Sequence, residues 1–224
     1  MDLTNDDNRP GAAGAARIPS FMERKRAELR SRGIDPDRLP PGQYVTDRFP
    51  VLHLGPVPSW EPSTWTLEIG GDAVAACSLT WSDFRDLPVT ELVADIHCVT
   101  KWSKFDVVWR GVTLDDLLAA THVDPQASTL LAWGEHGYSS NVALDELRDN
   151  PCLLAFEVGG APLEPEHGAP LRLVIPHLYF WKSVKWLRRV ELWRDPSLVG
   201  FWEQHGYHRH GDPFREQRYW GDDA

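Results

Sequence analysis

The sequence of 224 residues lacks the features that mark several large classes of protein. Its apolar runs are short, and none approaches the ~18 residues that a membrane-spanning helix needs. Positive charge is in deficit, because 23 lysines and arginines stand against 33 acidic residues and leave a net charge of −10. A chain this acidic is a poor default ligand for nucleic acid or for an anionic membrane surface. We therefore expect a protein that binds neither nucleic acid nor membrane.

Cysteine is also scarce, with three residues, Cys77, Cys98 and Cys152. Three thiols cannot all pair within one chain, and their spacing matches no zinc motif. Residues 1–21 are acidic and rich in glycine and alanine, without the apolar core of a secretion signal. Polar residues follow the basic run at 24–26, so an arginine-rich export signal is not expected either. These features favour a reducing, cytoplasmic location with at least one free cysteine.

Three regions are expected along the chain. Residues 1–20 are poor in aromatics and are predicted to be a disordered tail. Residues 21–39 are predicted to form a short helix and a linker, because Ser20 and Glu23 have the spacing of a capping box. Residues 40–224 are expected to form one domain. Eleven tryptophans against two methionines indicate a core and pockets built from large, rigid aromatics.

Strand patterns dominate this body. Apolar, β-branched segments bounded by turn residues lie at 65–71, 72–81, 89–100, 129–135, 152–163, 171–176 and 183–193. The first two read as a hairpin, and Gly159–Gly160 predicts a second hairpin turn. Short helices are expected near 80–86, over 113–121 from a Thr113 and Asp116 capping pattern, and over 143–150. The predicted fold class is α+β, mostly β, with short connecting helices.

Positive charge is distributed unevenly. From Gly168 to Val190 there is no acidic residue, yet this stretch holds five cations: Arg172, Lys182, Lys185, Arg188 and Arg189. A second basic group, Lys101, Lys104 and Arg110, follows Cys98. In so acidic a chain these stretches predict a site for a small anion. We expect Lys182 and Lys185, which lie among aromatics, to face that site, and Arg188 and Arg189 to face solvent.

Cys98 is the cysteine with the most informative surroundings. It ends a strand-like run, and Lys101 and Lys104 follow it closely. Nearby cations lower the pKa of a thiol and favour the thiolate, which is the form that ligates metals or attacks. Cys77 and Cys152 are interpreted as small buried hydrophobic residues.

Four segments, taken in order, point to one family. They are QYVTDRFPVLHLGPVP at 43–58, DIHCVTKWSKFDVVWRGVTLDDLL at 95–118, EHGAPLRLVIPHLYFWKSVKWLRRVEL at 166–192 and FWEQHGYHRHGDPFREQRYW at 201–220. Together they resemble the bacterial sulfite-oxidase-like oxidoreductases, and four ordered matches are far more specific than one. The resemblance implies the mixed α+β sulfite oxidase fold and a molybdenum–pyranopterin (molybdopterin) cofactor. It implies that the Cys98 thiolate is the single protein ligand of the metal.

The resemblance also implies contacts to the cofactor. The residues at matching positions are Phe49, Leu52, His53, Ser139, His167, Arg172, Ser183, Val184 and Lys185. Arg172 and Lys185 would bind the phosphate, and Ser183 and Val184 would offer backbone donors. Larger relatives carry polar residues in place of Phe49 and Leu52. Proximity to Cys98 adds His97, Lys104, Tyr138 and Trp102 as candidates for the substrate pocket.

The implied reaction is two-electron oxygen-atom transfer on a small sulfur-containing or related substrate, of the sulfite or sulfoxide type. The chain has no room for a haem module or an immunoglobulin-like dimerisation domain, so a separate electron-transfer partner is expected. Two alternatives stay open. One is a metal-free enzyme with Cys98 as nucleophile and His97 or His177 as base, although neighbours in a strand face opposite ways. The other is a non-catalytic binding module for a phosphorylated ligand.

The carboxy-terminal histidines His205, His208 and His210 form a pattern that could suggest a metal site. No cysteine or fixed helix accompanies them. We interpret them as surface or cleft-lining residues.

Overall fold

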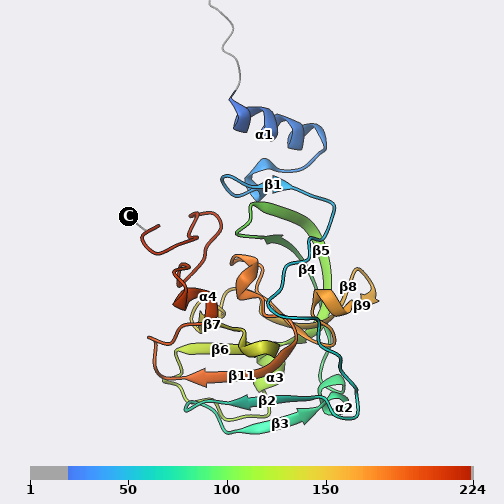
Figure 1. The fold of residues 1–224 in the computed structure, drawn as a ribbon, viewed down its shortest axis with the longest axis vertical. Helices are drawn as coiled ribbons and strands as arrows, with labels where there is room; N and C mark the ends of the chain where they lie inside the picture. Colours follow the sequence, from blue (N-terminus) through green and yellow to red (C-terminus); the bar gives the residue numbers. More distant parts are fainter. Residues whose placement is uncertain (1–19, 223–224) are drawn as a thin grey trace, which may run out of the picture. The chain divides into compact units, whose positions relative to one another are not determined.

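The computed structural model describes residues 20–222 and divides into two compact units, 1–38 and 39–224 (Figure 1). The described part of the first unit contains α1 (Phe21–Ser31) and a short 3-10 helix, η1 (Pro36–Arg38). The Glu23 amide donates to Ser20 Oγ at 3.2 Å, and the Ser20 amide donates to the Glu23 carboxylate at 2.5 Å. The predicted capping box is therefore confirmed. The predicted tail, apart from Ser20, lies outside the described residues.

The second unit is built on two sheets. The first has the order β1-β5-β8-β10, with β4 pairing to β5 and β9 pairing to β8. Its strands are β1 (Tyr44–Val45), β4 (Thr90–His97), β5 (Trp102–Thr113), β8 (Leu153–Val158), β9 (Ala161–Pro162) and β10 (Arg172–Val174). The short β1 runs parallel to β5, and the other pairings are antiparallel. The long strand β5 therefore organises this sheet.

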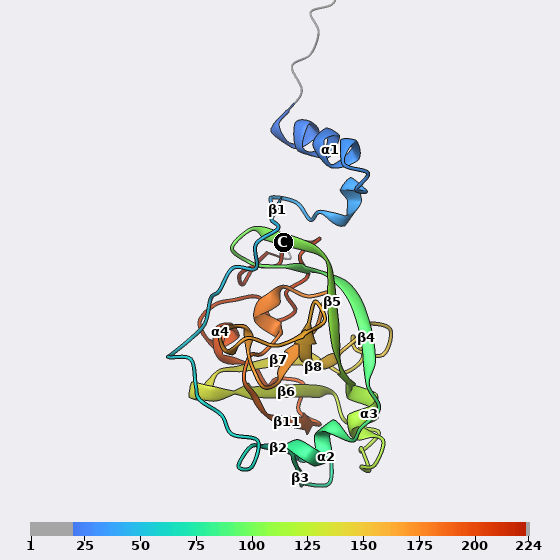
Figure 2. The ribbon, with the colours of Figure 1, turned by 90° about the vertical axis from the view of Figure 1, so that its right-hand side faces the viewer.

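The second sheet has the order β3-β2-β11-β6-β7. Its strands are β2 (Thr66–Gly70), β3 (Cys77–Thr80), β6 (Thr129–Gly134), β7 (Ser139–Ala143) and β11 (Leu187–Trp193). Strand β11 is central, parallel to β2 and antiparallel to β6. Figures 1 and 2 show these strands running across the molecule, while the β4–β5 hairpin stands upright beside them.

The helices of this unit are short and lie on connections. They are α2 (Trp81–Arg85), α3 (Leu114–Leu118) and α4 (Phe201–Gln204), with 3-10 turns η2 (Glu135–Gly137), η3 (Pro165–His167) and η4 (Phe180–Lys182). The α+β, mostly β fold class is confirmed, as are the two predicted hairpins.

Three local predictions fail. Residues 144–150 form turns instead of a helix, because the segment is too short to repay helix nucleation and ends at Pro151. Strands β5 and β7 were not predicted, since polar residues interrupt their apolar patterns. Cys77 is exposed on β3, whereas Cys152 is buried.

Buried apolar residues form two clusters. The larger lies between the sheets and includes Leu67, Val112 and Leu154. The smaller packs Cys98 with Trp102, Trp109 and other residues of the β4–β5 hairpin and its neighbours. Cys98 is therefore held by packed aromatic side chains at the end of the first sheet.

Candidate active site

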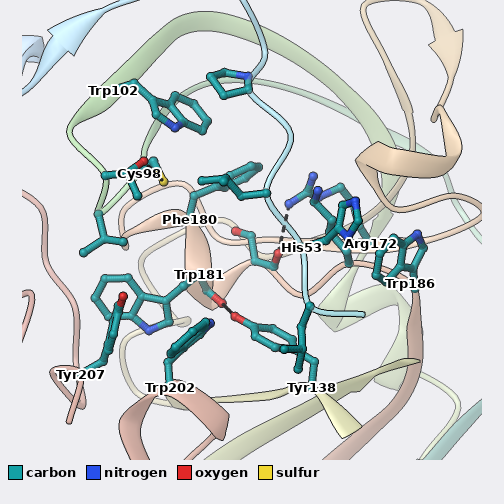
Figure 3. Close-up of a pocket in the computed structure, with 17 residues that line it drawn as sticks. His53, Cys98, Trp102, Tyr138, Arg172, Phe180, Trp181, Trp186, Trp202 and Tyr207 are labelled. Atoms are coloured by element: carbon teal, nitrogen blue, oxygen red, sulfur yellow. Dashed lines mark hydrogen bonds between the residues drawn. The ribbon is translucent and has the colours of Figure 1, made fainter. Parts of the chain in front are cut away.

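A cavity of about 330 Å³ lies beside Cys98, within the size range of small-molecule sites. The cavity is lined by segments that are far apart in the sequence. They include the segments that contain His53, Cys98, Tyr138, Arg172, Trp181 and Trp202. Seven of the 17 lining residues are tryptophan, tyrosine or phenylalanine, and the charged side chains in the lining are Arg172 and Lys185. No aspartate or glutamate is among the described residues that line this cavity. Figure 3 shows the arrangement.

Cys98 sits on the turn between β4 and β5. Its amide donates to Trp102 O at 2.8 Å, and the Lys101 amide donates to Cys98 O at 2.9 Å. Lys101 takes a left-handed conformation with φ of 76° to close this turn. The buried side chain of Gln43 donates from Nε2 to the same Cys98 oxygen at 3.0 Å. The backbone that carries the thiol is thus fixed from two sides.

The Cys98 sulfur is buried but reaches the cavity. Thr100 Oγ1 donates to Sγ at 3.1 Å. Burial raises the pKa of this thiol, while the hydrogen bonds from Thr100 and the charge of Lys185 lower it. The expectation that flanking lysines keep the thiol ionised is wrong. Lys101 is exposed and Lys104 Nζ donates to Asp47 O at 2.6 Å, so neither lines the cavity.

Arg172, a predicted site residue, lies on β10, and its guanidinium is completely buried. Its two terminal nitrogens donate to His167 O at 2.9 Å and to Ser183 O at 3.0 Å. No carboxylate among residues 20–222 forms a salt bridge with it. Burial lowers the pKa of Arg172 to about 9. A buried guanidinium without a counter-ion indicates a place for an anion.

Lys185 shares the cavity with Arg172. Its Nζ donates to Glu166 O at 2.6 Å, and burial, followed by the charge of Arg172, lowers the pKa of Lys185 to about 7. Gly168 allows the two cations to approach each other. A Cβ on Gly168 would lie 3.1 Å from Arg172 Cβ and 3.2 Å from Lys185 Cβ, and φ there is +112°.

The side chains of this cavity fit a ligand that has a metal at one end, for the thiolate, and an anionic group at the other, for the cations. The cavity brings together a buried thiol and two buried or half-buried cations, neither of which forms a salt bridge with a carboxylate of the described residues. Beside it His167 stacks on Phe49 with ring centroids 4.2 Å apart, and His167 Nδ1 is buried without a hydrogen-bond partner. A soft thiolate suits a thiophilic metal, and the cations suit a phosphate.

The structure gathers most of the predicted site residues. Those that line the cavity are Leu52, His53, Cys98, Trp102, Tyr138, Arg172, Ser183 and Lys185. Phe49, Ser139, His167 and Val184 are not in the lining. The Ser183 amide already donates to Phe180 O at 3.1 Å, and its Oγ accepts from the Ile175 amide. The Ser183 amide is therefore already used within the protein, and its role as a donor to the cofactor stays a prediction.

Two predicted pocket residues lie elsewhere. His97 is buried away from the cavity, with Nδ1 2.9 Å from Ser103 Oγ and its ring against Phe214. This follows from strand alternation, which turns neighbouring side chains to opposite faces. Lys182 is fully buried and forms a salt bridge with Glu203 at 2.6 Å, instead of facing the cavity. Arg188 and Arg189 pair with Glu135 and Glu68 at the surface, as expected.

Sequence reasoning missed an aromatic wall formed by Trp181, Trp202 and Tyr207, all of which line the cavity. The rings of Trp181 and Tyr207 lie 5.2 Å apart, and those of Trp202 and Tyr207 lie 5.0 Å apart. Tyr138 OH donates to Trp181 O at 2.5 Å. The abundance of tryptophan was the sole sequence signal for this wall.

The carboxy-terminal histidines do not form a metal site. His210 Nδ1 lies 2.5 Å from Glu146 Oε1, and His208 Nδ1 accepts from the amides of His210 and Gly211. Within residues 20–222, no group of three or more metal-ligating side chains is close enough to hold an ion. His208 is buried, whereas His205 is at the surface.

The geometry agrees with comparisons to known proteins. Residues 54–202 match the family model described as the oxidoreductase molybdopterin binding domain. The chain belongs to this family. It is 45% identical to a Bacillus subtilis (strain 168) protein named uncharacterized oxidoreductase YuiH, over 81% of this chain and 92% of that protein. This membership makes the protein an oxidoreductase of the sulfite-oxidase-like type, with a molybdenum–pyranopterin cofactor.

Other relatives are longer proteins. The chain is 25% identical to the protein-methionine-sulfoxide reductase catalytic subunit MsrP of Campylobacter jejuni, over 75% of this chain and 61% of that protein. It is 28% identical to sulfite oxidase of Gallus gallus, of which it covers 44%. The sulfane dehydrogenase SoxCD of Paracoccus pantotrophus shares the fold, with a TM-score of 0.59, 24% identity, and coverage of 65% of this chain and 42% of that one. No helix in residues 20–222 is long and apolar enough to span a membrane.

Proposed function

We propose that this protein transfers an oxygen atom, with two electrons, to or from a small sulfur compound at a molybdenum held by Cys98. The observation that carries the proposal is the shared cavity of Cys98, Arg172 and Lys185. Of the three cysteines, Cys98 is the one in the cavity lining, and neither cation there forms a salt bridge with a carboxylate of residues 20–222. The cofactor is expected to bind with its metal end at Cys98 and its phosphate at the cations.

The cofactor supplies the two-electron redox chemistry and the oxygen-atom transfer when it is bound. Cys98 would provide the metal ligand, and the Thr100 hydroxyl would hydrogen-bond to its sulfur as it does to the free thiol. Arg172 is held in place by two backbone carbonyls, which leaves its charge available to a phosphate. Trp102 and Phe180 also line the cavity and give it apolar surface.

Cys98→Ser tests the proposed ligand, with Cys77→Ser as a matched control because Cys77 is exposed and outside the cavity. Both variants are purified from a host that makes the molybdenum cofactor. The parent and Cys77→Ser should each hold about one molybdenum per chain, the stoichiometry of a single-thiolate site. Cys98→Ser should lose its activity and its Mo(V) resonance while its circular dichroism stays unchanged. Full activity in Cys98→Ser would show that Cys98 is not the ligand.

The two alternatives find less support. A cysteine nucleophile needs a base within hydrogen-bond reach, but neither His97 nor His177 lines the cavity. A binding module for a phosphorylated ligand would use Arg172 and Lys185, yet it would have no use for a thiol at the other end of the cavity. We also propose that a separate protein exchanges electrons with the site. We further propose a cytoplasmic location, because the three cysteines are unpaired.

A further inference from the structure

The cavity has two ends of different chemistry. In Figure 3, His53, Arg172 and Trp186 lie on one side, whereas Cys98, Trp181, Trp202 and Tyr207 lie on the other. Both charged residues of the lining, Arg172 and Lys185, are the ones that the proposed function assigns to the cofactor phosphate. The space beside Cys98 is therefore the end at which a substrate would meet the metal.

The cations that could have made this end positive are held elsewhere. Lys104 is bound to the Asp47 carbonyl, and Lys101 is exposed on the turn. Lys182 directly follows Trp181, but its ammonium points into the protein. It donates to Glu203 Oε1 at 2.6 Å, to Asn141 O at 2.9 Å and to Arg209 O at 2.6 Å. Its charge is thus neutralised behind the wall.

The same carboxylate holds the wall in place. Glu203 Oε1 also accepts from Trp181 Nε1 at 2.9 Å, and Glu203 follows Trp202 on α4. Trp181 is further fixed through its carbonyl by Tyr138 OH. The wall thus presents aromatic faces to the substrate end of the cavity, with no cation among its three residues.

We propose that this end of the site selects an uncharged organic sulfoxide over an inorganic oxyanion such as sulfite. This inference rests on the proposed function. An oxyanion needs charge-assisted donors and is costly to desolvate against aromatic rings. Desolvation costs an uncharged sulfoxide far less than it costs a charged oxyanion, and the sulfur and apolar substituents of the sulfoxide are stabilised by contact with aromatic rings.

The reaction balances as R₂SO + 2e⁻ + 2H⁺ → R₂S + H₂O. The sulfur–oxygen bond breaks, sulfur is reduced by two electrons, and the oxygen leaves as water after taking two protons from solvent. A protein electron donor would supply the electrons in the cell, and a reduced viologen dye supplies them in the assay.

The test uses the molybdenum-loaded protein and two probes, methyl phenyl sulfoxide with reduced viologen and sulfite with ferricyanide. We expect kcat/KM for the sulfoxide to exceed that for sulfite by at least about 100-fold, a difference of roughly 2.7 kcal/mol. Quenching of tryptophan fluorescence measures the binding of each probe independently of turnover. The sulfoxide should quench, and sulfite should not.

Trp202→Arg and Trp202→Phe separate the chemistry of the wall from its shape. Trp202→Arg places a cation at the substrate end and should lower kcat/KM for the sulfoxide by at least about tenfold while sulfite begins to bind. Trp202→Phe keeps an aromatic ring and should retain the preference for the sulfoxide. Circular dichroism and molybdenum content establish that both variants are folded and loaded.

The outcomes distinguish the two proposals. Absence of molybdenum from the parent protein, or loaded protein that turns over neither probe, would overturn the proposed function. Loaded protein that oxidises sulfite more efficiently than it reduces the sulfoxide would overturn the selectivity alone. Trp202→Arg that keeps the parental preference would also overturn the selectivity, because the wall would then not determine it.

Discussion

At the scale of single residues, the site places two cations together, and within residues 20–222 neither forms a salt bridge with a carboxylate. Arg172 is completely buried, and its charge lowers the pKa of the neighbouring Lys185. Gly168 permits this approach, since a side chain there would press on both residues. The cofactor-free protein therefore carries an unfavourable charge arrangement that a bound anion would relieve.

The pKa of Lys185 predicts how the stability of the cofactor-free protein depends on pH. Its pKa falls from an ordinary 10.5 to about 7 on folding. Between these values the unfolded chain binds a proton that the folded protein does not, so this residue makes stability rise with pH above 7. Because Lys185 is partly exposed, we expect about 1 kcal/mol between pH 7 and 9.

Urea unfolding at several pH values checks this expectation. The free energy of unfolding of the parent minus that of Lys185→Met should increase from pH 7 to pH 9. A bound anion would keep Lys185 charged, so the same difference should be flat in the loaded protein. A flat difference in the cofactor-free protein would contradict the assigned pKa.

Arg172 should determine how well the cofactor is retained. Arg172→Ala removes the buried charge and its fork of donors, and we expect the pterin content after purification to fall by at least about tenfold, since charge-assisted hydrogen bonds to phosphate are worth roughly 1.5–3 kcal/mol each. Arg189→Ala is the control, because Arg189 pairs with Glu68 at the surface. Pterin fluorescence after denaturation measures the content. Equal pterin in Arg172→Ala and the parent would rule out the phosphate role.

At the scale of elements, the turn between β4 and β5 fixes the position of the thiol. Gln43 precedes β1, and its side chain reaches the Cys98 carbonyl from outside the hairpin. The turn residue Lys101 adopts a positive φ, which favours glycine or asparagine over lysine. The contact from Gln43 therefore helps to hold a turn that is costly for its own sequence.

Gln43→Ala should destabilise the protein by about 1–3 kcal/mol, because it leaves a buried carbonyl short of one donor and opens a small space. Chemical denaturation measures the change. Arg110→Ala is a control on the same hairpin and should cost less than about 1 kcal/mol, since it removes a surface ion pair with Glu157. Equal costs for the two variants would show that Gln43 does not hold the turn.

The elements differ in how far their sequence determines them. Local signals sufficed for α1 and for the β2–β3 and β8–β9 hairpins, because capping residues and turn glycines act over a few positions. Strand β5 was not predicted because polar residues interrupt its apolar pattern, and the strand is instead stabilised by pairing with β1, β4 and β8, which no local stretch of sequence contains. A helix was predicted at 143–150 but is absent there, which shows that helix-forming residues alone do not specify a helix.

The candidate site likewise has residues that the sequence predicted and residues that it did not. The motif resemblance predicted Cys98, Arg172 and Lys185. The absence of acidic residues around Arg172 and Lys185 supported the same prediction. The predictions for Lys101, Lys104 and Lys182 failed because a sequence shows where charge is dense but not which way a side chain points. Lys182 turned inward to Glu203, which lies 21 positions later on another element. The aromatic wall depends on the same long-range pairing and was therefore invisible.

At the scale of the whole molecule, the Lys182–Glu203 pair joins η4 to α4 through the interior. Both side chains are fully buried, and Lys182 also bonds to the carbonyls of Asn141 and Arg209. Asn141 Oδ1 in turn accepts from the Gly200 amide at 3.1 Å. This network fastens the segment that carries Trp202 and Tyr207 to β7.

Single replacement in this pair should be far more damaging than replacement of both members. Lys182→Met or Glu203→Leu alone leaves a buried charge unpaired and should cost about 3–5 kcal/mol, whereas the double variant should recover part of this loss. A double-mutant cycle by urea unfolding measures the coupling. The surface pair Arg189–Glu68 serves as control and should show a coupling below about 1 kcal/mol. Additive losses at Lys182 and Glu203 would mean that the pair is not coupled.

The wide spacing of the cavity's residues bears on the order of events during biosynthesis. Its lining begins at Pro50 and ends at Tyr207, so the side supplied by Trp202 and Tyr207 is missing until these residues have left the ribosome. Contacts between such distant positions form late in folding, since each requires a long loop to close. Nascent chains would therefore lack the complete site, and cofactor insertion is expected to follow translation instead of accompanying it.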